Sequence, residues 1–479
     1  MTEIDLDPEA GAPARVRPFS TRVTQLCLAL WVAIVALDKV GQALTDSALT
    51  FRNPVEVAVT TSEAPLELLE GVGAVGVPLG PLAGETSALR ADAVDVLALA
   101  RERLEDLGGQ GSADADDLFE LRVRQAVLER DGGADEPRFA ELEGATPEQL
   151  AGPLVEAGAV AFDGASTERA EACIEAALGL REGLARTLLL ENLGDALDDD
   201  PRLQREVDDA RAGYADRAGR LALLVIVIGL LGLVGLATVG ALAFLPSRTL
   251  RLDPQQAPNR WADWNSGIGL FARYAAGLLL IQTALAATLG TDLALGWIGL
   301  ASSMPLAIYM LRHYRDPHLR RSELGLGLER SRLVFLPPLA LGGWVMAGAM
   351  LIAISVVGGT SNDPFTNPIL DLLADDDPSL GLRLLVDACL WAPLFEELGF
   401  RAALFGGLRS RMGFLPAALI SSTVFGVAHA YDPVGTAAIV GVGFAPAVLY
   451  ERTRSIQACM LAHAVFNFFQ LQFAFTLFG

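Results

Sequence analysis

Residues 221–246 read LALLVIVIGLLGLVGLATVGALAFLP and contain no charged side chain. About 20 consecutive apolar residues in a helix are enough to cross the hydrocarbon core of a bilayer. Because this stretch exceeds that length, it predicts a membrane-spanning helix. It also marks the point where the chain changes from an acidic to an apolar composition, which indicates two differently built parts.

Further apolar stretches follow this helix to the end of the chain. Together with residues 221–246 they give about eight predicted spans, so residues 219–479 are expected to form a polytopic membrane helix bundle. The other predicted spans are residues 266–290, 293–311, 334–358, 382–408, 415–430, 434–450 and 456–478.

An earlier apolar run lies at residues 23–41, behind a short tail that includes Arg15 and Arg17. A signal peptide is one interpretation of this arrangement. Asp38 and Lys39 interrupt the run, and no convincing A-x-A cleavage site follows it. We therefore favour an uncleaved transmembrane anchor at 23–41 after a cytoplasmic tail at 1–22.

The acidic residues gather between these two apolar parts. The chain of 479 residues has a formal charge of −22 although 52% of its residues are hydrophobic. In residues 42–218, Leu, Val and Ala recur at helical spacing among charged residues, which predicts an acidic, helical extramembrane domain. Nucleic acid is not expected as a partner because no basic stripe is available for its phosphates. The helices expected in this domain are 87–107, 116–130, 168–190 and 202–218.

The fold class predicted from these patterns is all-α, a membrane helix bundle with an inserted soluble helical domain. Basic and acidic loops alternate between the spans: arginines such as Arg248 and Arg411 mark some of the loops, and the acidic run 375–377 marks another. Cytoplasmic loops are enriched in Lys and Arg. The pattern places the N-terminus in the cytoplasm and residues 42–218 outside. The Ala-, Gly-, Leu-, Asp- and Arg-rich composition suggests the inner or plasma membrane of a bacterium.

Ionisable side chains are rare inside predicted spans because each costs about 2.5–3.5 kcal/mol at the centre of a helix. Residues 382–408 nevertheless contain Glu396, Glu397 and Arg401, and we expect this span to break near Pro393. Glu397 and Arg401 are four residues apart, so they can pair on one helix face.

Two later spans contain further polar pairs at the same spacing. Phe425 lies four residues before His429, and His463 lies four residues before Asn467. Glu396 and His429 are 17 and 16 residues from the turn at Gly413. Both should lie about 25 Å from that turn at the rise of an α-helix. Similar counting from the turn at 452–454 brings His463 and Asn467 into the same slab of the membrane.

In this order, Glu396-Glu397 with Arg401, Phe425 with His429, and His463 with Asn467 resemble the motifs EExxxR, FxxxH and HxxxN of the CPBP family. This family includes the CAAX prenyl endopeptidases and bacterial Abi proteins. The resemblance covers about 380–470 and implies an intramembrane endopeptidase that cleaves a membrane-associated protein or peptide.

The resemblance also implies roles for these residues. Glu396 would be the general base for a water molecule, with His429 orienting that water. His463 and Asn467 would donate hydrogen bonds to the oxyanion. Glu397 with Arg401 would hold these groups in place.

Three questions stay open at this point. The first is metal binding: the protein would hold no cofactor or one divalent metal ion, and Glu396, His429 and His463 would be its ligands if Zn²⁺ is bound. The second is whether the protein is instead a non-catalytic membrane binding or immunity protein, whose 42–218 domain captures a protein partner. The third is a transporter with a Glu–His proton relay, which is disfavoured because the sequence shows no inverted repeat.

Overall fold

The computed structural model describes most of the chain, and the statements below concern only the residues that it describes. These are residues 19–44, 54–74, 83–108, 115–131, 151–164, 167–197, 200–253, 261–281, 284, 308–310, 312–314, 321–358, 378–429, 431 and 433–478. The predicted span 293–311 lies outside the described residues except for 308–310, and most of the tail 1–22 lies outside them as well.

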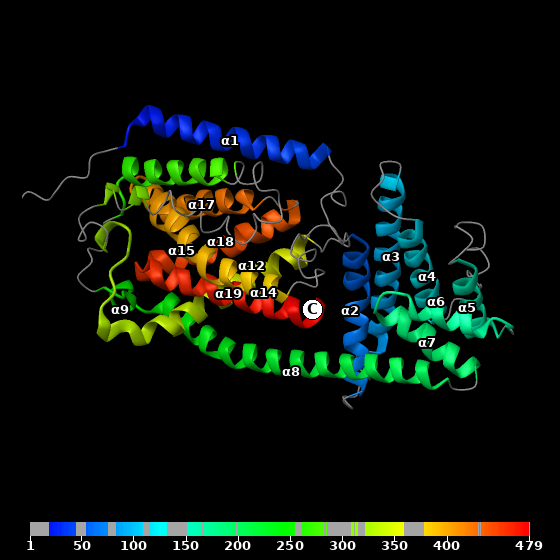
Figure 1. The fold of residues 1–479 in the computed structure, drawn as a ribbon. Helices are drawn as coiled ribbons and strands as arrows, with labels where there is room; N and C mark the ends of the chain where they lie inside the picture. The colour runs from blue at the N-terminus through cyan, green and yellow to red at the C-terminus, as the bar shows by residue number, and fades with distance from the viewer. Residues whose placement is uncertain are drawn as a thin grey trace, which may run out of the picture. The chain divides into compact units, whose positions relative to one another are not determined.

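Every regular element in the described part of the chain is a helix (Figure 1), which confirms the predicted all-α fold class. Four of these helices are long and apolar enough to cross a membrane. They comprise residues Pro201–Phe244, Arg330–Val357, Pro433–Thr453 and Ile456–Leu477. The first is also poorly covered by protein: Leu230 and Leu233 are 63% and 65% exposed. Such exposed apolar side chains suit a lipid environment better than water.

The chain divides into two compact units. One unit comprises residues 41–229, 360–381 and 469–479, and the other comprises residues 1–40, 230–359 and 382–468. Helix α8 (Pro201–Phe244) passes through the boundary at residue 229 as one continuous helix. The sequence had suggested a separate helix at 202–218 before the span, but the helix continues through the two intervening residues, Gly219 and Arg220.

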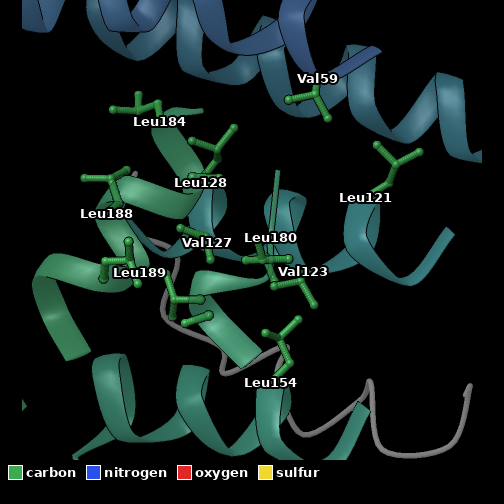
Figure 2. Packing of buried hydrophobic residues seen from close by; sticks show 14 of the residues in the cluster. Val59, Leu121, Val123, Val127, Leu128, Leu154, Leu180, Leu184, Leu188 and Leu189 are labelled. Atoms are coloured by element: carbon green, nitrogen blue, oxygen red, sulfur yellow. The ribbon is translucent and has the colours of Figure 1, made fainter. Parts of the chain in front are cut away.

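The first unit contains a helical domain inserted between α1 (Thr21–Leu44) and the apolar half of α8. Its helices are α2 (Pro54–Ala74), α3 (Ala83–Gly108), α4 (Ala115–Asp131), α5 (Ala151–Asp163), α6 (Ala170–Leu178) and α7 (Leu184–Ala196). We call α2–α7 and the first half of α8 the inserted domain. Figure 2 shows its core, in which side chains from α2, α4, α5 and α7 gather.

A buried ion-pair network connects the helices of the inserted domain. Arg124 of α4 is fully buried and lies 2.8 Å from Glu63 Oε1 of α2. The other carboxylate oxygen of Glu63 accepts a hydrogen bond from the Ala185 backbone N–H at the start of α7. Burying charges is costly unless they are paired and hydrogen-bonded, so this network requires the three helices to meet in one arrangement.

The single helix expected at 168–190 is two helices in the structure, α6 and α7. The helix is interrupted at residues 179–183, where the backbone of Gly183 has φ = 150°. A Cβ atom at this position would collide with Glu63 Oε2 and lie 2.7 Å from Arg124 Nη1. Only glycine therefore allows the backbone to pass the buried ion pair.

The second unit contains all the polar residues of interest, on helices that belong to it except at residues 378–381 and 469–478. These helices include α12 (Leu336–Gly358), α14 (Pro378–Val386), α15 (Ala392–Glu396), α16 (Gly406–Arg409), α17 (Phe414–Ala428), α18 (Pro433–Thr453) and α19 (Ile456–Phe478). Helix α18 packs against both α12 and α17. A preceding helix, residues 264–281, approaches residues 403–407 closely, since a Cβ atom at Gly267 would lie 2.6 Å from the Ala403 carbonyl oxygen.

The expected break near Pro393 is absent. Residues 378–409 form one continuous helix that widens into two π-helical segments, η5 (Asp387–Trp391) and η6 (Glu397–Phe405). Pro393 lies in the first turn of the short α-helical segment between them. Widening the helix accommodates the missing proline N–H without ending the helix.

Candidate active site

Glu396 and His429 face each other from neighbouring helices. Glu396 ends α15 and His429 is the C-cap of α17, and the distance from Glu396 Oε2 to His429 Nε2 is 4.0 Å. The two side chains remain 24% and 28% exposed. This distance is too long for a direct hydrogen bond, but the two atoms are close enough for one water molecule to contact both.

A neighbouring carbonyl determines which nitrogen of His429 carries a proton. Nδ1 lies 2.8 Å from the backbone oxygen of Phe425, one turn earlier in α17. Because a carbonyl oxygen can only accept a hydrogen bond, Nδ1 must be the donor. In the neutral imidazole, Nε2 is then an acceptor, and it is the nitrogen nearest to Glu396.

Glu397 lies in a different environment from Glu396. It is fully buried, its Oε1 is 2.9 Å from His463 Nδ1, and its Oε2 is 3.3 Å from Arg401 Nε. Arg401 also donates a hydrogen bond to the Gly443 carbonyl at 2.8 Å, and its guanidinium lies 4.4 Å from the centre of the Phe425 ring. These contacts join η6, α17, α18 and α19, so the Glu397–Arg401 pair is the point at which four segments are held together.

Asn467 points to a different part of the same helix. Its Nδ2 donates a hydrogen bond of 2.7 Å to the backbone oxygen of Ala388, which lies eight residues before Glu396. The structure thus brings Glu396 together with His429, and Glu397 together with Arg401 and His463. It places the amide of Asn467 against the backbone of η5.

Three features of this site were not predicted from the sequence. The ring of Tyr274, from the 264–281 helix, packs on Gly399, one turn after Glu396. Tyr431 stacks on His429 with ring centres 6.3 Å apart. The Gly443 carbonyl receives Arg401. An aromatic residue two positions after His429 was the only one of these that the sequence alone could have suggested.

The donor groups of this site do not form a set that fits a metal ion. Within the described residues, no group of three His, Cys, Asp or Glu side chains is placed to hold one. His463 directs Nδ1 to Glu397, whereas His429 faces Glu396. The three ligands proposed from the sequence therefore do not converge in this arrangement.

Comparisons with known proteins match the same part of the chain. The family model described as type II CAAX prenyl endopeptidase Rce1-like matches residues 378–469. A Bacillus subtilis (strain 168) protein named "Putative membrane peptidase YdiL" is 33% identical over 124 residues. The aligned region is 26% of this chain and 48% of that protein, so the chain spans about half the length of this relative. No solved structure matches.

The matched residues 378–469 include all the motif residues from Glu396 to Asn467. The apolar helices and this match define a membrane protein with a domain of a membrane protease family. More particularly, residues 378–469 are similar to the Rce1-like CAAX prenyl endopeptidases, in the region where the three motifs resemble the CPBP family.

Proposed function

We propose that this protein is an intramembrane endopeptidase in which Glu396 and His429 activate a water molecule. The observation that carries the proposal is the gap of 4.0 Å between Glu396 Oε2 and His429 Nε2, together with the fact that Glu396 Oε2 is buried and accepts no hydrogen bond from the described residues. A water molecule between them can be about 2.8 Å from each atom, which is a normal hydrogen-bond distance.

The hydrogen-bond pattern orients this water for attack. Glu396 as a carboxylate and His429 Nε2 are both acceptors, so the water donates one hydrogen to each. A lone pair of its oxygen is then free to attack the peptide carbonyl carbon. As the C–O bond forms, Glu396 takes one proton, and it returns this proton to the amine nitrogen as the C–N bond breaks. General base catalysis of this kind contributes about 10²–10⁴-fold to a rate.

The buried group of Glu397, Arg401 and His463 supports this reaction by fixing the helix that carries Glu396. A catalytic side chain must be held close to its productive geometry by neighbours that are themselves fixed. Glu397 and Arg401 are at most 1% exposed, and each makes contacts to other segments. The family resemblance assigns oxyanion donation to His463 and Asn467.

The substrate we propose is a protein or peptide associated with the membrane, because the Glu396–His429 pair lies between helices of an apolar bundle. We also propose that the bundle has about eight spans in a bacterial plasma membrane, with the N-terminus in the cytoplasm and the inserted domain outside. The alternation of basic and acidic loops supports this orientation.

The test is cleavage of a panel of membrane-anchored peptides by the purified full-length protein in detergent. Wild type is compared with Glu396→Gln and His429→Ala, each with and without a chelator. We expect both variants to lose at least 100-fold in kcat/KM, since each removes one contact to the water. Unchanged cleavage by either variant would contradict the assignment.

One observation favours a second candidate function, the capture of a protein partner. The inserted domain contains a cavity of about 540 Å³ between α2, α7 and α8. Its lining includes seven acidic residues and three arginines, and five of the acidic residues form ion pairs with arginines of the same domain: Glu56, Glu63, Glu67, Glu182, Glu206, Asp209, Asp216, Arg186, Arg217 and Arg220. We propose that a partner binds through the acidic groups that remain. Biological activity that survives Glu396→Gln would favour this function over proteolysis.

A further inference from the structure

The backbone oxygen of Ala388 has lost both of the helix donors that could reach it. In an α-helix the N–H of residue 392 would bond to this oxygen, and in a π-helix the N–H of residue 393 would do so. The Ala392 N–H bonds to the Asp387 oxygen instead. Residue 393 is proline, which has no N–H to donate.

Asn467 supplies the missing donor from another helix. Its Nδ2 lies 2.7 Å from the Ala388 oxygen. A backbone carbonyl without a partner is costly in a membrane, because no water is available there to bond to it. The amide of Asn467 therefore compensates for a hydrogen bond that Pro393 removes from the helix of Glu396.

The position of this bond relates it to the proposed reaction. Helix α19 makes side-chain hydrogen bonds to the helix of Glu396 through Asn467 at Ala388 and through His463 at Glu397. Glu396 lies between these two points in the sequence. The two bonds together fix the rotation of η5 and α15, and with it the direction of the Glu396 carboxylate toward His429.

We propose that Asn467 is a positioning residue that replaces the N–H missing at Pro393 and so aims Glu396 at His429. This inference rests on the proposed protease function. It differs from the oxyanion role that the family resemblance assigns to Asn467, because a positioning role depends on Pro393 and an oxyanion role does not.

The dependence on Pro393 gives the experiment. Cleavage of a membrane-anchored peptide and the unfolding temperature are measured for wild type, Asn467→Ala, Pro393→Ala and the double variant. Asn467→Ala should lower kcat at least tenfold with little change in KM. In the double variant, the Pro393→Ala change again supplies a backbone N–H for the Ala388 oxygen. The same Asn467→Ala change should then cost less than threefold in kcat.

A backbone N–H at position 393 bonds to the Ala388 oxygen, so it cannot replace a side chain that donates to the oxyanion. If Asn467→Ala costs as much kcat in the Pro393→Ala background as in wild type, while the unfolding temperature is retained, the positioning role is wrong. If Asn467→Ala does not fold in the wild-type background, the test is cleavage by the double variant compared with Pro393→Ala. There, retained cleavage supports the role and lost cleavage overturns it.

The unfolding temperature separates this inference from the proposed function. If wild type cleaves no peptide, the protease proposal fails, but the coupling between residues 393 and 467 still shows as a smaller loss of unfolding temperature in the Pro393→Ala background. An equal loss in both backgrounds would contradict the inference whatever the activity.

Discussion

Glu396 and Glu397 are neighbours in the chain but differ in everything that surrounds them. Glu397 is fully buried between Arg401 and His463, whereas Glu396 retains 24% of its exposure and faces His429 across a gap. The π-helical segment η6 begins at Glu397. We therefore expect Glu397 to act on stability and Glu396 to act on the reaction.

A substitution at Arg401 tests whether the buried Glu397 group stabilises the fold. Arg401→Met should destabilise the protein by about 3–5 kcal/mol, because it leaves the buried Glu397 charge without its main partner. The control is Arg220→Met, since Arg220 pairs with Asp216 at 3.2 Å and the two side chains are 58% and 70% exposed. Exposed pairs contribute about 0–1 kcal/mol. Equilibrium unfolding in mixed detergent measures both values, and equal losses would contradict the prediction.

Glu67 makes the stability of the inserted domain depend on pH. Burial raises the pKa of this carboxyl from 4.5 to about 7, and Arg217 opposes the increase. Between these two pH values the folded state holds a proton that the unfolded state has released, so stability falls as pH rises. Glu67→Gln should remove this part of the decrease.

The measurement is hydrogen exchange of α2 and α7 in the full-length protein between pH 5 and pH 8, corrected for the intrinsic pH dependence of exchange. Wild type should lose more protection than Glu67→Gln as pH increases. Parallel curves for the two proteins would show that Glu67 does not titrate in this range.

At the level of elements, the break between α6 and α7 depends on Gly183. Gly183→Ala should destabilise the inserted domain by about 2 kcal/mol or more, since a Cβ atom there meets the Glu63–Arg124 pair and the backbone has φ = 150°. Gly213→Ala is the control, because a Cβ atom at Gly213 has no atom within 4 Å. Hydrogen exchange of α4 and α7 compares the variants, and equal protection in both would contradict this account.

The same break shows how far the sequence could be followed. Periodicity correctly indicated helices near 87–107 and 116–130, which became α3 and α4. Periodicity predicted one helix where the structure has two, α6 and α7. The helix is interrupted because of a tertiary contact with Glu63, which lies more than a hundred residues earlier and leaves no local signal. Helices α2 and α5 were not predicted. Helix α2 has Pro65 in its interior and many β-branched residues at 55–61, and both features disfavour a helix.

The candidate site was partly readable for a similar reason. Spacing of four residues predicted the pair of Glu397 with Arg401, and counting from Gly413 predicted that Glu396 and His429 lie at one level. Neither argument could find the contact of Asn467 with Ala388, which depends on the π-helical segment before Pro393. Residue spacing predicts side-chain pairs only where the helix is regular, so a contact at a π-helical segment is missed.

At the scale of the whole molecule, the orientation in the membrane is testable by labelling. In a chain without its native cysteines, an impermeant maleimide should label Asp208→Cys in the inserted domain on intact bacteria. It should label Arg411→Cys, in a predicted cytoplasmic loop, only after the membrane is permeabilised. Both positions are exposed in the structure. Labelling of Arg411→Cys on intact cells would show that the orientation is reversed.

The central claim is that Glu396 performs the reaction while Glu397 holds the fold, and one comparison tests it most directly. Cleavage rate and unfolding temperature are measured side by side for Glu396→Gln and Glu397→Gln in the same purified preparation. We predict that Glu396→Gln loses at least 100-fold in kcat with an unchanged unfolding temperature, and that Glu397→Gln lowers the unfolding temperature. Cleavage at the wild-type rate by Glu396→Gln would contradict the account.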